Sequence, residues 1–205
     1  MSDIICVTNR ALCPGDFLQQ IEAIAKAAPA AIILREKDLT AIEYERLAKQ
    51  VLAICRKHDV RCILHSFVDS AIWLRATAIH LPLPILRDML PEEKAKFTLI
   101  GASCHSVREA IEAEKLGCSY VTAGHVFATD CKKGLPPRGT SFLQEVCDAV
   151  SIPVYAIGGI TPANMAEIRE THAVGACVMS GLMRCADPKE FLESFDSGKD
   201  LNYEV

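Results

Sequence analysis

Residues 154–181 read VYAIGGITPANMAEIRETHAVGACVMSG and carry the pattern on which the fold prediction depends. A short apolar run, Val154–Ile157, ends at two glycines. A helix-like stretch over Pro162–Thr171 follows, and a second apolar run occupies Cys177–Ser180. Because parallel neighbouring strands need a crossover connection, a strand, a helix and a strand in this order predict one unit of a parallel sheet.

The same alternation extends along the whole chain. The expected strands are Ile4–Thr8, Ala31–Arg35, Cys62–Leu64, Ala78–His80, Leu99–Ser103, Tyr120–Ala123, Val154–Ile157 and Cys177–Ser180. The expected helices are Phe17–Ala28, Ala41–Lys57, Val68–Arg75, Pro91–Lys96, Val107–Leu116, Gly139–Ala149, Pro162–Thr171 and Pro188–Ser194. Eight such units predict an α/β fold that closes into a single (β/α)8 TIM barrel over residues 1–205, with residues 196–205 as a loosely ordered tail. An open doubly wound sheet is the alternative, but no G-x-G-x-x-G follows the first strand to support a dinucleotide site.

Local signals at the helix ends support these boundaries. Thr40 and Ser106 lie at expected N-caps, with Glu43 and Glu109 three residues later, as in a capping box. Gly117 lies just beyond one helix, where a left-handed residue is expected.

The composition indicates a folded globular protein. Hydrophobic residues make up 50% of the chain, charged residues 23%, and the net charge is −4. An acidic balance disfavours a general nucleic-acid binder. No apolar run reaches the ~18 residues of a membrane span, and Ile4–Val7 is too short for a signal-peptide core. We therefore expect a cytoplasmic homo-oligomer that binds neither nucleic acid nor membrane.

The ten cysteines are expected to be reduced and mostly structural. They form no C-x-x-C pair, and most lie within apolar segments, where a free thiol behaves as a small hydrophobic side chain. Cys104 and Cys131 are the two in loop-like settings, so we expect any reactivity there.

Polar residues gather where the expected strands end, which is where a (β/α)8 barrel places its active site. Four of the six histidines fall there: His65, His80, His105 and His125. His125 opens the longest connection between elements, and imidazole is well matched to proton transfer near neutral pH. The alternative is that it is only hydrogen-bonded at a strand end.

Two glycine-containing turns predict a phosphate site at the ends of the last two strands. Gly158 and Gly159 allow backbone N–H groups to approach an anion, and Ser180 with Gly181 offers a similar turn beside them. Barrels of this kind often bind phosphate with these two loops.

Several landmarks resemble the thiamine phosphate synthase superfamily along nearly the whole chain. They are the stretches 33–37 (ILREK), 100–106 (IGASCHS), 156–160 (AIGGI) and 178–181 (VMSG). Within the superfamily, residues 124–135 (GHVFATDCKKGL) resemble the thiazole tautomerase (TenI) branch, whereas the synthase branch carries Gly-Pro in place of Gly124-His125.

The resemblance also implies a difference at a metal site. In the synthase branch two aspartates hold magnesium, one in an Asn-Asp pair after strand 3 and one in a Gly-Gln-Glu-Asp stretch after strand 4. This chain has His65-Ser66 at the first place and His80 followed by Leu81 at the second. Mg²⁺ prefers oxygen ligands, so the pyrophosphate half of the synthase reaction is expected to be lost. Asp69 lies three residues beyond the first place, on the following helix.

The resemblance implies a thiazole tautomerase, and we expect an isomerase that aromatises a carboxythiazole phosphate tautomer by a proton shift without metal or cofactor. The resemblance implies that His125 is the acid–base group. It also implies a set of substrate-binding residues: Arg35, Lys37, Ser103, Thr129, Asp130, Cys131, Lys132, Gly158, Gly159, Met179, Ser180 and Gly181. Arg35 is the expected partner of the ring carboxylate, since a guanidinium matches a carboxylate in a bidentate way.

Two other functions remain open. One is thiamine phosphate synthesis from thiazole phosphate and pyrimidine pyrophosphate, and the other is a non-catalytic sensor or regulator that kept the phosphate pocket. His65 and His80 are expected from neither branch. They are a second acid–base group, ligands of another metal, or neutral replacements.

Overall fold

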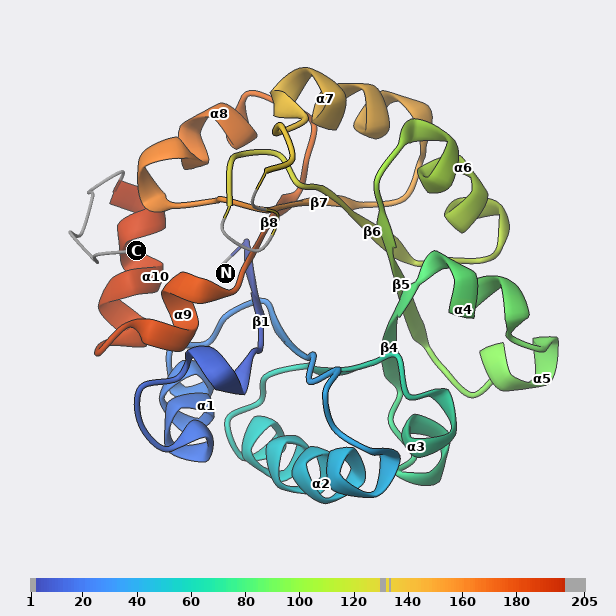
Figure 1. Ribbon diagram of the computed structural model, residues 1–205, viewed down its shortest axis with the longest axis vertical. Coiled ribbons are helices and arrows are strands. Elements are labelled where there is room, and N and C mark those ends of the chain that lie inside the picture. Colours follow the sequence, from blue (N-terminus) through green and yellow to red (C-terminus); the bar gives the residue numbers. More distant parts are fainter. Residues whose placement is uncertain (1–2, 130–131, 133, 198–205) are drawn as a thin grey trace.

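Eight parallel strands close into a barrel in the order of the chain, with helices around the outside (Figure 1). The computed structural model describes residues 3–129, 132 and 134–197. The strands are β1 (Ile4–Val7), β2 (Ala31–Leu34), β3 (Cys62–His65), β4 (Ala78–Pro82), β5 (Leu99–Cys104), β6 (Tyr120–Gly124), β7 (Val154–Ile157) and β8 (Gly175–Val178). The predicted (β/α)8 fold is confirmed, and β1 closes the barrel by pairing with β8.

The longer helices cover the strands on the side away from the barrel axis. The helices of the described part are η1 (Arg10–Leu12), α1 (Phe17–Lys26), α2 (Ala41–Lys57), α3 (Val68–Trp73), α4 (Leu83–Asp88), α5 (Pro91–Lys94), α6 (Val107–Lys115), α7 (Gly139–Ala149), η3 (Pro162–Asn164), α8 (Met165–Arg169), α9 (Ser180–Arg184) and α10 (Pro188–Ser197). Within these residues no helix is both long and apolar enough to cross a membrane.

Successive strand residues alternate between two apolar layers, because side chains along a strand point to opposite faces. One layer fills the barrel and includes Ile5, Ile33, Ile63 and Tyr120. The other layer, which includes Ile32, packs between the strands and the helices. This alternation decides which residues beyond each strand face the barrel mouth.

Helix α2 shows how local sequence sets an element boundary. The Thr40 hydroxyl accepts from Glu43 N at 3.3 Å, and the Glu43 carboxylate accepts from Thr40 N at 2.9 Å, so the predicted capping box is formed. After α6, Gly117 has a φ of 91°, the left-handed conformation expected of it.

Strand β8 begins and ends two residues earlier than predicted. Gly175 approaches Asp3 so closely that a Cβ would lie 2.0 Å from the Asp3 carbonyl oxygen, and Ala176 N donates to that same oxygen. This pairing fixes the strand over Gly175–Val178, so Ser180 begins α9 instead of ending β8.

Two further boundaries differ from the prediction. Helix α4 was missed, although Pro82 and Pro84 mark a helix start, where proline is tolerated. Helix α10 continues through Ser197, so residues 196 and 197 of the predicted tail are helical, because Phe195 is buried and Arg169 hydrogen-bonds its carbonyl.

All nine described cysteines are free thiols. Cys104 is the last residue of β5 and is buried, not in a loop, and burial raises its pKa to about 12. The expectation that it is reactive is therefore wrong, because the thiolate is the nucleophile. Cys131 lies outside the described residues.

Candidate functional site

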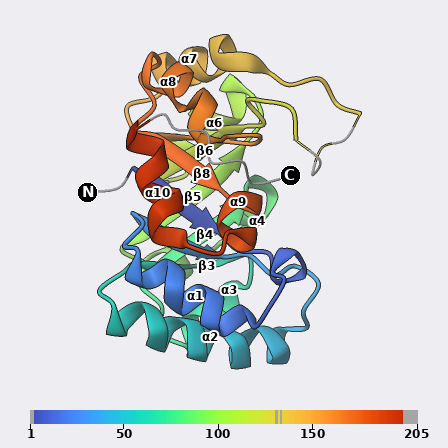
Figure 2. The same ribbon diagram turned by 90° about the vertical axis from the view of Figure 1, so that its left-hand side faces the viewer.

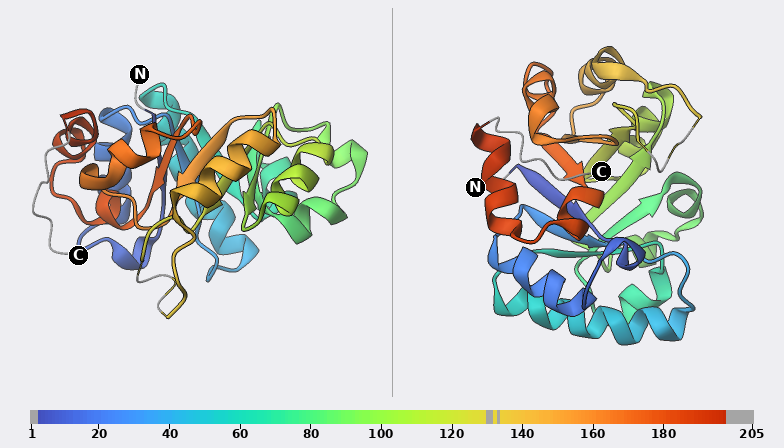
Figure 3. Two further views of the ribbon diagram at one scale, coloured as in Figure 1. Left: turned by 90° about the horizontal axis from the view of Figure 1, so that it is seen from above. Right: turned by 60° about the vertical axis from the view of Figure 1, so that its left-hand side comes forward.

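The carboxyl ends of the strands open on one side of the barrel, where η1 and the β6–α7 connection also lie (Figures 2 and 3). Parallel strands place all their carboxyl ends at the same edge, so residues from distant parts of the chain meet here. The polar groups of this face, the barrel mouth, fall into three regions that differ in charge.

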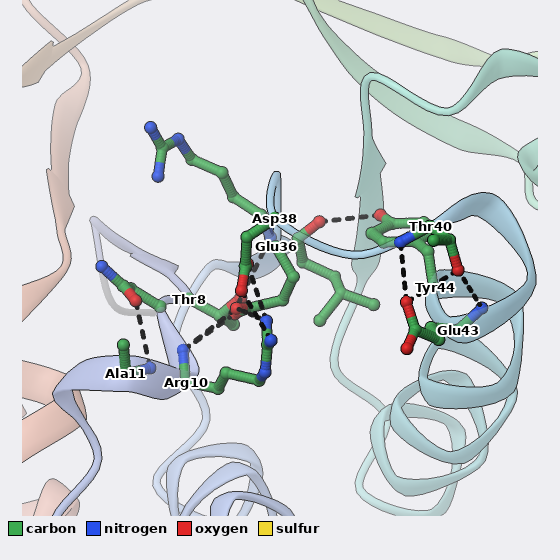
Figure 4. A network of polar contacts seen from close by, with 11 residues as sticks. Thr8, Arg10, Ala11, Glu36, Asp38, Thr40, Glu43 and Tyr44 are labelled. Carbon is green, nitrogen blue, oxygen red and sulfur yellow. Dashed lines mark hydrogen bonds and ion pairs between the residues drawn. The ribbon is translucent and has the colours of Figure 1, made fainter.

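The first region, the β1–β2 corner, is built on the carboxylate of Glu36. Glu36 is 2% exposed and accepts from Thr8 Oγ1 at 2.6 Å and from Arg10 N at 3.1 Å. Arg10 reaches from η1 to Glu36 at 3.3 Å and makes a two-point contact with Asp38 at 2.7 and 2.6 Å (Figure 4). A buried carboxylate needs such donors, because burying an unpaired charge is costly.

This corner orients two predicted substrate-binding residues. Thr8 Oγ1 donates to Glu36 and accepts from Arg35 N at 3.0 Å, so the ends of β1 and β2 are tied together. Within the described residues, the side chains of Arg35 and Lys37 form no ion pair. Partial burial, with nearby Arg35 and Lys132, lowers the pKa of Lys37. The mouth therefore holds three cations, Arg35, Lys37 and Lys132, which we call the cation group.

The second region, the β3–β5 corner, is neutral. His80 Nδ1 lies 3.0 Å from the Tyr120 hydroxyl, and His80 Nε2 lies 2.8 Å from Ser103 Oγ. His65 Nδ1 lies 2.7 Å from Ser66 Oγ, and the two imidazole rings stack with centroids 5.8 Å apart. The predicted residue Ser103 is thus brought beside both histidines.

Burial keeps both imidazoles uncharged. It lowers the pKa of His65 to about 2 and that of His80 to about 3, and the positive charges of Lys37 and Arg35 act in the same direction. Among the roles open to these histidines, the structure therefore favours neutral replacements.

Tyr44 of α2 joins the two corners. Its hydroxyl donates to the Leu34 carbonyl at 2.7 Å and accepts from His65 N at 2.8 Å, so it links the ends of β2 and β3. Its ring is fully buried and stacks on Phe67 with centroids 4.2 Å apart.

Thr122 adds a hydroxyl to the neutral corner. It pairs in register with Ser103 and alternates with the interior residue Tyr120, so its side chain faces the barrel. Thr122 is 2% exposed, and its Oγ1 has no hydrogen-bond partner within the described part of the chain. Buried hydroxyls are normally paired, so this one is available to a ligand.

The third region contains the predicted phosphate-binding residues of β7 and β8. Ile157 and Cys177 are register partners, so the turns that follow the two strands are neighbours. Gly158 and Gly159 have positive φ angles of 102° and 67°. A Cβ at Gly158 would lie 2.4 Å from His125 Cβ, and one at Gly159 would lie 2.2 Å from the Ala128 carbonyl oxygen.

Close packing therefore explains why both positions are glycine. Met179 and Ser180 lie at the start of α9, and Gly181 leaves room for Phe191, whose ring a Cβ would meet at 2.4 Å. Phosphate binding by these residues stays a prediction.

His125 lies against the β6–α7 connection. It is 8% exposed, and its Nε2 is 3.4 Å from the Leu135 carbonyl, a long contact. Its carbonyl accepts from Arg138 N, so its backbone is fixed as expected. Thr129 and Lys132 lie in the same connection, joined by a backbone hydrogen bond of 3.0 Å. Asp130 and Cys131 lie outside the described residues.

Sequence reasoning missed several residues that shape the mouth: Thr8, Arg10, Glu36, Tyr44, Tyr120 and Thr122. The sequence gives one indication of the position of Glu36. Successive side chains of an extended chain point to opposite faces, so the Glu36 side chain points away from those of Arg35 and Lys37. No comparable sequence pattern indicates that Tyr120 contacts His80.

The donors of the mouth do not fit magnesium. Mg²⁺ takes oxygen ligands, usually one or two carboxylates. At the ends of β3 and β4 the chain offers imidazole and hydroxyl groups, and Glu36 is already held by three donors. No cluster of three or more His, Cys, Asp or Glu side chains suited to a metal occurs in the residues described.

Comparison with known sequences identifies relatives over most of the chain. The family described as thiamine monophosphate synthase matches residues 4–182. Thiamine-phosphate synthase 2 of Streptococcus pneumoniae serotype 4 is 33% identical over 184 residues, covering 87% of this chain and 86% of the relative. Thiamine-phosphate synthase of Syntrophomonas wolfei is 35% identical over 188 residues, covering 88% of each.

A solved structure agrees with these matches. Thiamine phosphate pyrophosphorylase from Pyrococcus furiosus superposes with a TM-score of 0.81 at 28% identity, covering 95% of this chain and 94% of that one.

These relatives overturn the prediction of a thiazole tautomerase and, with it, of an isomerase. Relatives 31–35% identical over most of their length are named thiamine-phosphate synthase, a transferase, which favours the synthase alternative. The prediction gave residues 124–135 and the missing aspartates more weight than the rest of the chain. The proton-shift role of His125 belonged to that interpretation and is withdrawn with it.

Proposed function

The chain belongs to the thiamine monophosphate synthase family, and on this basis we propose that it forms thiamine phosphate from a thiazole phosphate and a pyrimidine pyrophosphate. In this reaction the thiazole phosphate displaces pyrophosphate from the pyrimidine. The thiazole nitrogen uses its lone pair to form a bond to the exocyclic carbon of the pyrimidine, the bond between that carbon and the pyrophosphate oxygen breaks, and the pyrophosphate leaves with the electron pair.

The cation group is the observation that carries this proposal. Desolvation lowers the pKa of Lys37, and the positive charges of the nearby Arg35 and Lys132 lower it further. Like charges held together disfavour one another unless an anion joins them. A leaving pyrophosphate is such an anion, and charge that develops on it is stabilised by fixed cations.

The other regions have separate tasks in this proposal. Gly158, Gly159 and Ser180 line the end of the mouth suited to the single phosphate of the thiazole. Ser103 and Thr122 offer hydroxyls to the reacting groups from the neutral corner. The two phosphorylated groups would thus occupy different sides of one opening.

Synthesis of thiamine phosphate by the purified chain tests the proposal. Both substrates are supplied, and thiamine phosphate and released pyrophosphate are quantified, with equal amounts expected. Lys37→Gln should lower kcat/KM about tenfold or more, because a hydrogen bond to a charged group contributes about 1.5–3 kcal/mol. Lys49→Gln is the matched control, since Lys49 is exposed in the middle of α2.

Equal losses in both variants would show that Lys37 has no special role. Binding of both substrates without any product would reject the synthase and favour the non-catalytic sensor.

A further inference from the structure

The described residues of the mouth include three cations, Arg35, Lys37 and Lys132, but no set of donors that fits magnesium. We propose that this chain binds the pyrophosphate group directly through Arg35, Lys37 and Lys132, with no divalent cation between protein and ligand. The proposal rests on the proposed function for the identity of the ligand. It concerns a different property, namely how the negative charge is neutralised.

The two histidines are poor ligands for magnesium, which prefers oxygen donors. A neutral imidazole has one N–H and one lone pair. Both nitrogens of His80 already contact hydroxyls, so its lone pair accepts from Tyr120 or from Ser103 in either tautomer. His65 Nδ1 contacts the Ser66 hydroxyl, which engages the lone pair of the ring when its proton lies on Nε2. A metal would have to break these bonds inside a buried site.

Three carboxylates near the mouth in the described part of the chain, those of Glu36, Asp38 and Asp69, are also engaged or exposed. Glu36 accepts from Thr8 and from both the backbone and the guanidinium of Arg10. Asp38 is held by Arg10 in a two-point contact and is 68% exposed. Asp69 is exposed in the first turn of α3. None is free to take the place of a carboxylate at the ends of β3 and β4.

The positive groups, by contrast, form no ion pair with an acidic side chain of the described residues. None of the salt bridges among the described residues includes a member of the cation group. This holds although an acidic residue, Glu36, lies between Arg35 and Lys37 in the sequence. Glu36 and Asp38 neutralise Arg10 instead, so the acidic groups of this corner do not compete with a ligand. Guanidinium and ammonium groups are the usual side-chain partners of phosphate oxygens.

The neutral corner completes the site with uncharged donors. Thr122 Oγ1 is buried and unpartnered within the described residues, and its register partner Ser103 is already held by His80. A hydroxyl that finds no protein acceptor can donate to a phosphate oxygen. The replacement of carboxylates by neutral side chains also removes the repulsion that an anion would otherwise meet there.

Equilibrium dialysis with radiolabelled inorganic pyrophosphate tests the proposal. The protein is dialysed in EDTA and again with excess Mg²⁺, and Mn²⁺ is followed in a parallel cell as a detectable substitute for Mg²⁺. We expect pyrophosphate to bind in EDTA and Mg²⁺ not to tighten it. Mn²⁺ should not accumulate with the protein. Lys37→Gln should weaken binding about tenfold or more, and Lys49→Gln should not.

A double variant, His65→Asn with Ser66→Asp, provides the reverse comparison. It restores a carboxylate after β3, at a position with a φ of 66° that aspartate tolerates, and should make Mg²⁺ tighten pyrophosphate binding. Binding by the wild type only with Mg²⁺, or no binding in either buffer, would overturn the proposal. Metal-free binding without thiamine phosphate synthesis would reject the proposed function alone.

Discussion

The β1–β2 and β3–β5 corners lie side by side at the barrel mouth and hold their polar groups in opposite ways. The first buries a charged carboxylate, Glu36, and satisfies it with three donors. The second buries His65 and His80 uncharged, each joined to a hydroxyl. One corner is therefore stabilised by charge pairing, and the other by the removal of charge.

This difference indicates where an anion can enter. The acidic groups of the charged corner are occupied by Arg10, which leaves the cation group facing a neutral neighbour. A corner that carried carboxylates would need a metal ion before it could accept pyrophosphate, whereas a neutral corner does not.

Among single substitutions, removal of the Glu36 carboxylate should have the largest effect. Glu36→Ala leaves Thr8 Oγ1 and Arg10 N without their acceptor in a buried place, so we expect a loss of about 3–4 kcal/mol in the free energy of unfolding. Asp38→Ala removes an exposed partner of the same arginine and should cost about 1 kcal/mol or less. Urea unfolding of both variants measures the difference, and equal losses would contradict the account of this corner.

Acid should next distinguish the two corners. The pKa values of His65 and His80 are lowered to about 2 and about 3 from 6.5, so the unfolded chain binds more protons as the pH falls below 6.5. Stability should therefore fall as the pH falls from 6.5 toward 3, by up to ~1.4 kcal/mol per pH unit for each histidine. Other groups also titrate there, so the test compares the wild type with a His65→Asn, His80→Gln variant by urea unfolding. Equal slopes would show that the histidines are not buried uncharged.

A smaller loss of stability is expected from Gly101→Ala, which disturbs the neutral corner through Tyr120. The new Cβ would lie 2.2 Å from the Tyr120 ring, whose hydroxyl contacts His80. Such overpacking should cost about 2 kcal/mol in the free energy of unfolding. Gly15→Ala, with no atom within 4 Å of the new Cβ, is the control and should change stability by less than about 0.5 kcal/mol. Equal thermal stability of the Gly101→Ala and Gly15→Ala variants would show that the Tyr120 ring does not pack against Gly101.

The strands could be predicted because each combines an apolar run with a turn signal, and all eight expected strands correspond to strands of the barrel. Helix α9 could not be predicted, because the contact of Gly175 with Asp3, a residue distant in sequence, sets where β8 begins and therefore where α9 can follow. Helix α4 had a local proline signal that was not used.

The mouth was predictable only in part for the same reason. Arg35 and Lys37 could be placed because they come just after β2, and Ser103 because it lies at the carboxyl end of β5. The partners of Glu36 and His80 are 23 to 40 residues distant in sequence, so spacing does not reveal them. The tautomerase prediction failed because a local resemblance at residues 124–135 was given more weight than the relatedness of the whole chain.

The rate of thiamine phosphate formation in a single turnover, with excess EDTA and then with Mg²⁺, tests the account most directly. The wild type should react at the same rate in both, because Arg35, Lys37 and Lys132 neutralise the pyrophosphate without a metal. The His65→Asn, Ser66→Asp variant should react faster with Mg²⁺. Product formed by the wild type only when Mg²⁺ is present would contradict the account.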